Sequence, residues 1–300
     1  MLSYGDANHP SAVTNHSTLN KNYTYDANGN MLTRGNQTLT WDIDNRVSSI
    51  AITGGGSTSM EYDYSGMRVK KNAPTGITLF PFQGYEIDPN GVITKFIRIG
   101  IESFASRKGA NQYFYHNDHL GSVNVITNSS GTRVQLNEYD PWGQVPRSEG
   151  TIDPTHRFTG QMLDPETGLY YYGGRYYDSE IGRFISPDPF VQDPYDPQNL
   201  NRYSYVINNP QNYIDPDGYF HRHKKKSSGG FWSIFSGIFS IVVGIITLQP
   251  ELAALGVAEM TVSLTNIAIG LGSIARGVSD LVSGLGDAGP PGIGGGGVGV

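Results

Sequence analysis

Aspartate followed by proline is the most frequent candidate for chemistry in this sequence. The dipeptide occurs eight times, at Asp88, Asp140, Asp153, Asp164, Asp188, Asp193, Asp196 and Asp215. Two carboxyl groups held close together share one proton, because both cannot ionise cheaply, and such a pair can serve as base and acid. The alternative is a structural role, since proline fixes φ and aspartate is favoured at the start of a turn.

A second group of residues, His116, Asp118 and His119, has side chains that ligate metals. On a strand, His116 and Asp118 would share one face and His119 would point to the other. A metal site is therefore not favoured, and we expect neither a metal nor another cofactor. His221 and His223 alone do not make a catalytic site.

Composition and charge narrow the classes of function. The formal net charge is −6, which argues against broad binding of nucleic acid. The sequence has no cysteine, which excludes a disulfide framework and a thiolate metal site. Its first residues lack the basic and apolar regions of a Sec signal peptide.

The elements that must position these residues are short strands. Abundant glycine and tyrosine favour many strands joined by tight turns. Residues 92–102 place four isoleucines on one face with a period of two, which predicts a strand after the turn at 88–91. Residues 122–140 predict two strands around an Asn-Ser-Ser-Gly turn. Helical periodicity is absent up to about residue 220, so we expect a mainly β structure.

A loose repeat joins an aromatic residue to aspartate, followed by a turn with glycine or asparagine. It begins at Tyr25-Asp26, Trp41-Asp42, Tyr62-Asp63 and Tyr139-Asp140. A unit this short cannot bury its own face and must stack on its neighbours. We predict that the aromatic ring fills the core and that the aspartate caps the backbone amides of the turn.

The last part of the chain differs in character. Residues 221–230 form a basic linker, and residues 231–248 contain no charge, which is just long enough for a membrane-spanning helix. Residues 251–286 predict one or two further helices with few charges, and the glycine-rich end from 288 to 300 predicts disorder. The region 231–287 is either a hydrophobic hairpin that inserts into a membrane, or a buried helical segment, or a linker to a lost domain. These interpretations stay open.

Several motifs resemble those of RHS proteins, whose YD repeats look like the repeat above. Residues 113–123, 156–189 and 201–219 resemble the RHS repeat-associated core. The resemblance implies an antiparallel β-strand spiral that forms the wall of a hollow shell, closed at one end by the core. A variable C-terminal region, often a toxin, follows the core in this family. The chain is short by comparison, and we expect it to be the C-terminal fragment of a larger shell.

The resemblance divides the chain. YD-repeat strands are expected over residues 1–110 and the core over 111–220. The linker at 221–230, the apolar helical region at 231–287 and the glycine-rich end at 288–300 follow.

In some RHS proteins the core cuts its own chain with two aspartates, and the resemblance assigns that role to Asp188 and Asp215, with Arg175 beside them. Cleavage would fall between Tyr219 and Phe220. The second motif, Asp-Pro-x-Gly at 215–218, is intact, whereas the first lacks its glycine. Asp193 has the spacing of the family but lacks the flanking context, so an insertion near 190–198 is expected. The alternative is that both aspartates only make turns within the core.

Three functions follow as expectations. The first is the C-terminal part of an RHS-type polymorphic toxin, a shell that presents and releases a membrane-active region. The second is a non-toxic surface or interaction scaffold with a membrane-anchoring tail and no self-cleavage. The third is an aspartyl-type autoprotease that acts on its own chain. Expected partners are an immunity protein, a membrane, and the remainder of a larger shell or secretion apparatus, with no nucleic acid. The expected location is secreted or cell-surface associated.

Overall fold

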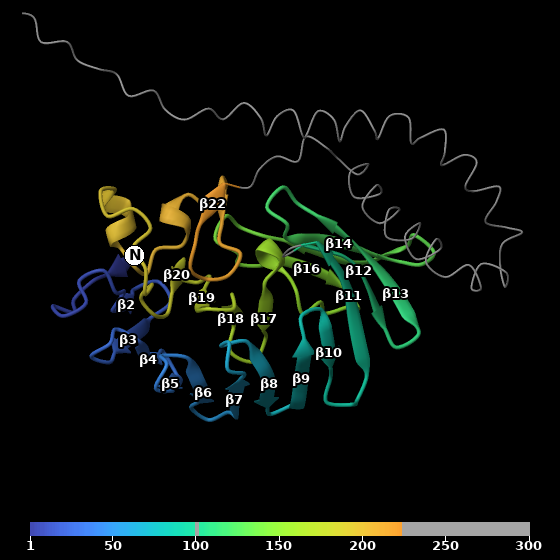
Figure 1. Cartoon of the computed structure of the whole chain (residues 1–300), viewed down its shortest axis with the longest axis horizontal. Coiled ribbons are helices and arrows are strands. Elements are labelled where there is room, and N and C mark those ends of the chain that lie inside the picture. Colours follow the sequence, from blue (N-terminus) through green and yellow to red (C-terminus); the bar gives the residue numbers. More distant parts are fainter. Residues whose placement is uncertain (100–101, 224–300) are drawn as a thin grey trace, which may run out of the picture. The chain divides into compact units, whose positions relative to one another are not determined.

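The computed structural model describes residues 1–99 and 102–223 (Figure 1). Most of the basic linker, the apolar region at 231–287 and the glycine-rich end therefore lie outside the described residues, and the predictions for them stay predictions. Within the described part of the chain, no helix has the length and hydropathy needed to cross a membrane.

A single antiparallel sheet of 16 strands dominates the structure, and each strand pairs with the next one along the chain. Figure 1 shows these strands following one another in sequence order from blue to green. The strands are β1 (Leu2–Ser3), β2 (Asn15–His16), β3 (Lys21–Tyr25), β4 (Met31–Arg34), β5 (Gln37–Trp41), β6 (Val47–Ile52), β7 (Ser57–Tyr62), β8 (Arg68–Ala73), β9 (Gly76–Phe82), β10 (Tyr85–Ile87), β11 (Ile93–Ile99), β12 (Glu102–Lys108), β13 (Asn111–Asn117), β14 (Val123–Asn128), β15 (Arg133–Glu138) and β16 (Arg147–Gly150).

Smaller elements follow the large sheet. A four-stranded antiparallel sheet contains β17 (Met162–Asp164), β18 (Leu169–Tyr171), β19 (Tyr176–Asp178) and β20 (Arg183–Phe184), and β21 (Tyr213–Ile214) pairs with β22 (Arg222–His223). Helix is limited, in the described residues, to the short 3₁₀ turns η1 (Phe158–Gly160), η2 (Pro197–Leu200) and η3 (Val206–Asn208). The prediction of a mainly β structure with little helix is confirmed over these residues.

The repeated turns have the predicted geometry. Asp26 Oδ1 accepts the backbone N–H groups of residues 28 and 30, and Asp42 and Asp63 cap the residues two and four positions on in the same way. Asp140 repeats the arrangement after β15. Each carboxylate thus satisfies two amides that the tight turn would leave unpaired.

The aromatic residue of each repeat packs inward, also as predicted. Tyr25, Trp41 and Tyr62 pack against one buried apolar cluster, which joins residues of β3–β7 to residues of β18 and β19. The Tyr25 hydroxyl donates to the Val13 carbonyl, and the Tyr62 hydroxyl donates to the Val47 carbonyl. The rings therefore fill the interface between the large sheet and the small sheet while their polar ends stay paired.

Buried ion pairs join the same two sheets. Arg34 on β4 binds Asp178 on β19 through Nε at 2.6 Å, and Arg68 on β8 binds Asp164 on β17 at 2.5 Å. Burial raises the pKa of Asp164, but the charges of Arg68 and Lys71 outweigh it, so the net pKa lies below the usual aspartate value. These ion pairs link the small sheet to the large one.

The prediction of one strand over residues 92–102 is wrong in its extent, and Ile101 lies outside the described residues. The strand β11 ends at Ile99, and Glu102 already belongs to β12. Ile93 and Ile97 do share a face, but it is the exposed one, because Thr94 is buried on the other side. A register shift between Ile97 and Arg98 then breaks the period of two.

Candidate active site

The three predicted catalytic residues come from three strand ends of the core. Arg175 directly precedes β19, in the tight turn after β18, where Gly173 has a φ of +89°. Asp188 follows β20, and Asp215 follows β21. The three residues lie far apart in the sequence, and these short strands bring their side chains to one place.

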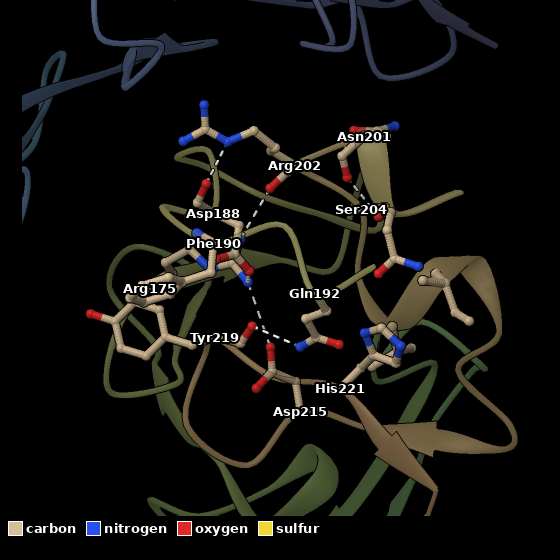
Figure 2. A pocket seen from close by; sticks show the side chains of 13 residues that line it. Arg175, Asp188, Phe190, Gln192, Asn201, Arg202, Ser204, Asp215, Tyr219 and His221 are labelled. Atoms are coloured by element: carbon tan, nitrogen blue, oxygen red, sulfur yellow. Dashed lines mark hydrogen bonds and ion pairs between the residues drawn. The ribbon is translucent and has the colours of Figure 1, made fainter. Parts of the chain in front are cut away.

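Arg175 holds the two aspartates together. Its Nη2 lies 2.8 Å from Asp188 Oδ2 and 3.6 Å from Asp215 Oδ2. Figure 2 shows Asp188 and Asp215 on opposite sides of this guanidinium group. All three residues are buried, and the Arg175 side chain lies over the Phe184 ring at 3.7 Å. The arrangement is a carboxyl pair bridged by one cation in a low-dielectric setting.

Asp193, the alternative with the family spacing, does not join this site. Its Oδ1 accepts the backbone N–H of Tyr195 at 3.0 Å, and its side chain lies outside the cavity that Asp188 lines. Asp88, Asp140 and Asp196 likewise accept the backbone N–H two residues on, which confirms the turn interpretation for them.

The remaining two Asp-Pro residues bind basic side chains, and the Asp164 carbonyl also accepts the N–H groups of Thr167 and Gly168, which confirms the turn predicted there. Asp153 pairs with Arg157, and Asp164 pairs with Arg68 and Lys71.

The loop after Asp215 is tightly built. Asp215 Oδ1 accepts the N–H of Gly218 at 2.8 Å, and Arg175 Nε donates to the Gly218 carbonyl. Gly218 has a φ of +81°, and a Cβ there would lie 2.9 Å from the backbone nitrogen of Arg175. Only glycine fits both demands, so the glycine of the second motif has a clear steric reason.

The first motif does without its glycine. Asp188 Oδ1 accepts the N–H of Phe190 at 2.9 Å, which closes the turn. Phe190 and Val191 are not among the residues with positive φ, so the backbone here carries none of the strain that would demand glycine. The turn after Asp188 is therefore one that ordinary residues can form.

Two residues in the site were not predicted from the sequence. The Arg202 carbonyl accepts from Arg175 Nη1 at 3.1 Å and from the Asp188 N–H at 2.8 Å. Gln192 Nε2 donates to the Tyr219 carbonyl at 3.0 Å. Arg202 lies within a motif that carried the resemblance, whereas no sequence pattern pointed to Gln192.

The bond expected to be cut lies at the same place. Tyr219 lines the same cavity as Arg175, Asp188 and Asp215. The ring of Phe190 stacks on Phe220 with 5.7 Å between centroids and meets the Tyr219 ring edge-on at 6.0 Å. Residues on both sides of the Tyr219–Phe220 bond are thus held by the segment that follows Asp188.

Burial shifts the acidity of both aspartates in the same direction. Burial raises the pKa of Asp215 to about 6, against the opposing charge of Arg175. Burial also raises the pKa of Asp188, again partly offset by Arg175. Asp188 has the closer contact with the cation, so we assign the ionised form to Asp188 and the protonated form to Asp215.

The cavity between these residues has a volume of about 30 Å³. A polar cavity holds a water molecule once it exceeds roughly 10–15 Å³. The cavity, whose lining includes Asp188, Asp215 and Tyr219 (Figure 2), is therefore large enough for a water molecule. Base, acid, water site and peptide bond are what acid–base hydrolysis of an amide requires.

His116, Asp118 and His119 have separate roles. Asp118 Oδ1 accepts two turn amides, from Leu120 and Ser122. His116 Nε2 contacts Thr127 Oγ1 at 3.1 Å, and His119 Nε2 contacts the Gln211 carbonyl at 3.2 Å. No group of three or more potential metal ligands occurs among the described residues.

The sequence is similar to a known protein family and to several toxins and nucleases. The sequence model of the Teneurin YD-shell family matches residues 102–211. The tRNA3(Ser)-specific nuclease WapA of Bacillus spizizenii is 32% identical over 210 residues, which is 66% of this chain and 9% of the relative. Toxin protein Tse5 of Pseudomonas aeruginosa is 37% identical over 106 residues, 35% of this chain and 8% of the relative. The chain thus spans about a tenth of the length of these curated relatives.

Among solved structures, the crystal structure of TcdB2-TccC3-Cdc42 aligns with a TM-score of 0.57 and 24% identity. The alignment covers 65% of this chain and 11% of the matched chain. At this identity the likeness shows the fold alone, and it confirms the antiparallel β architecture derived above.

Proposed function

Because this chain is an RHS/YD-repeat protein, we propose that it is the closing end of a toxin-related β-shell that cuts its own chain between Tyr219 and Phe220. The observation that carries the proposal is the meeting of two buried aspartates, one arginine and Tyr219 around one small cavity. The reaction is hydrolysis of one amide in the same chain, so the protein is an enzyme acting on itself.

The geometry supports a definite division of roles. The Asp188 carboxylate takes a proton from a water molecule in the cavity, and the water oxygen bonds to the Tyr219 carbonyl carbon. The proton held by Asp215 passes to the Phe220 nitrogen as the carbon–nitrogen bond breaks. The products are a carboxylic acid at Tyr219 and an amine at Phe220, and Arg175 keeps the two carboxyl groups in place throughout.

Cleavage would not by itself free the released segment. Tyr213 and Ile214 on β21 pair with His223 and Arg222 on β22, and these strands lie on opposite sides of the cut. The new end therefore stays bound by a short β ladder. We propose that the segment from Phe220 onward is a cargo that leaves only when this ladder opens.

We further propose that the cargo acts on membranes through residues 231–287. Support comes from the uncharged stretch at 231–248. A secreted or cell-surface location follows from this function, as do an immunity protein as partner and a larger shell or secretion apparatus around the chain.

The test is the mass of the purified full chain beside Asp215→Asn. Fragments of residues 1–219 and 220–300 in the wild type, and an intact chain in the variant, are expected. An intact wild-type chain would instead favour a scaffold with a permanently attached tail. Dye-loaded liposomes then test the cargo in mild urea that opens the β21–β22 ladder, because the cut protein should then release dye and uncut Asp215→Asn should not. Equal dye leakage from both proteins, or none from either, would contradict the proposal that release of the cargo causes the leakage.

A further inference from the structure

We infer that Gln192 is the oxyanion donor of the cleavage site, an inference that rests on the self-cleavage proposed above. The residue lies four positions after Asp188, in the segment where the chain departs from the family motif. Figure 2 shows its amide pointing at the carbonyl of Tyr219. The nitrogen-to-oxygen distance is 3.0 Å.

That carbonyl is the one on which charge develops. When water adds to the Tyr219 carbon, the carbonyl oxygen becomes an oxyanion, and a donor already in place stabilises it without reorganisation. The side chains of Asp188 and Asp215 cannot supply this contact while they serve as base and acid. An amide N–H is neutral and fixed, so it can stabilise the anion without exchanging a proton.

Gln192 is also held in position. Phe190, two residues earlier, packs against the rings of Tyr219 and Phe220. The Asp188 carboxylate caps the N–H of Phe190 at 2.9 Å. The turn that carries the base therefore also sets the distance of Gln192 from the scissile carbonyl, which couples the two functions in one short segment.

The segment after Asp188, where an insertion is expected, thus has a role in the proposed cleavage. Without glycine after Asp188-Pro189, the chain forms an aspartate-capped turn whose next residues reach across the cavity to the scissile bond. This segment supplies an aromatic contact through Phe190 and an amide donor through Gln192.

The test compares cleavage rates of pulse-labelled full chain, made by cell-free synthesis, for the wild type, Gln192→Leu and Gln198→Leu. Gln198 is an exposed glutamine in the same inserted region, and its side chain accepts from Asn208. Loss of one oxyanion donor costs on the order of 10²-fold in rate, so Gln192→Leu should be slower by that factor and Gln198→Leu unchanged. Equal rates for all three would overturn the role of Gln192 and leave self-cleavage intact.

A second variant separates catalysis from folding. Glutamate at this position keeps the size of the side chain but repels the oxyanion when ionised. The rate of Gln192→Glu relative to wild type should therefore recover as pH falls and the carboxyl group becomes a donor. A ratio that does not change with pH would argue for a purely structural role and against the inference.

A spectroscopic measurement reads the contact itself. Tyr-Phe occurs twice in the sequence, at 113–114 and 219–220, so labelling tyrosine carbonyls with ¹³C and phenylalanine amides with ¹⁵N gives two carbonyl–amide correlations. In the uncut Asp215→Asn chain, adding Gln192→Leu should shift the Tyr219 carbonyl resonance upfield and leave Tyr113 in place. An unmoved Tyr219 resonance would overturn the contact. A wild-type chain that never cuts would overturn both the donor role and the proposed function.

Discussion

Cleavage should slow as pH rises through the range where Asp215 loses its proton. In the proposed mechanism Asp215 acts as the acid, so the active form is the protonated one, and burial raises its pKa to about 6. About half of the chains are then competent at pH 6, roughly a tenth at pH 7 and roughly a hundredth at pH 8. The rate should therefore fall about tenfold per unit above pH 6.5.

The fall in cleavage rate at low pH is expected to reflect protonation of Asp188, which must be ionised to act as the base. Its pKa is raised by burial, so the rate should begin to fall at a higher pH than an ordinary aspartate would give. The positive charge of Arg202 lowers the pKa of Asp188. Arg202→Gln should move the low-pH limb upward and leave the limb above pH 6 in place, which assigns the two limbs to the two aspartates.

The assay uses full chain synthesised at pH 8, where cutting is slow, and then transferred to buffers between pH 4.5 and 8. The fraction cut is followed by gel, with tryptophan fluorescence as a check that the fold persists. A rate that is flat between pH 6 and 8, or that rises with pH, would refute Asp215 as the acid.

Two further predictions concern stability in an uncut background, measured by urea denaturation. Asp164→Asn should lower the free energy of unfolding by about 3–5 kcal/mol, because Arg68 is left buried without its charge partner. Glu61→Gln, at an exposed pair, should cost under about 1 kcal/mol, and equal losses would contradict the role given to burial. Gly218→Ala should cost more than Gly91→Ala, since both have positive φ but only the former meets backbone within 3 Å. The same free-energy change at both would show that φ, and not close approach, explains Gly218.

Local features of the fold were predictable from the sequence. The turns at Asp26 and Asp63 involve only residues within four positions, so residue type and spacing contain the information. The aromatic residue before each aspartate has one large apolar face, and its burial follows from the need of each repeat to stack. The side of the sheet that each β11 residue faces was harder to predict, because a register shift after Ile97 changes which side chains face inward.

The candidate site was predictable only through the resemblance. Motif context distinguished Asp188 from Asp193, and the contact of Arg175 with Asp188 agrees with it. The positions of Gln192 and Arg202 depend on how β20, β21 and the loops between them pack. No local pattern encodes that a side chain at 192 reaches a carbonyl at 219.

The central claim is that the two aspartates hydrolyse the Tyr219–Phe220 bond. The most direct measurement is mass spectrometry of the full chain cut in H₂¹⁸O, with Asp188→Asn and Asp215→Asn beside it. We predict a fragment that ends at Tyr219 and carries ¹⁸O in its new carboxylate, from the wild type alone. A break after Asp215, as acid lability of an Asp-Pro bond would give, or a chain cut equally in both variants, would contradict the claim.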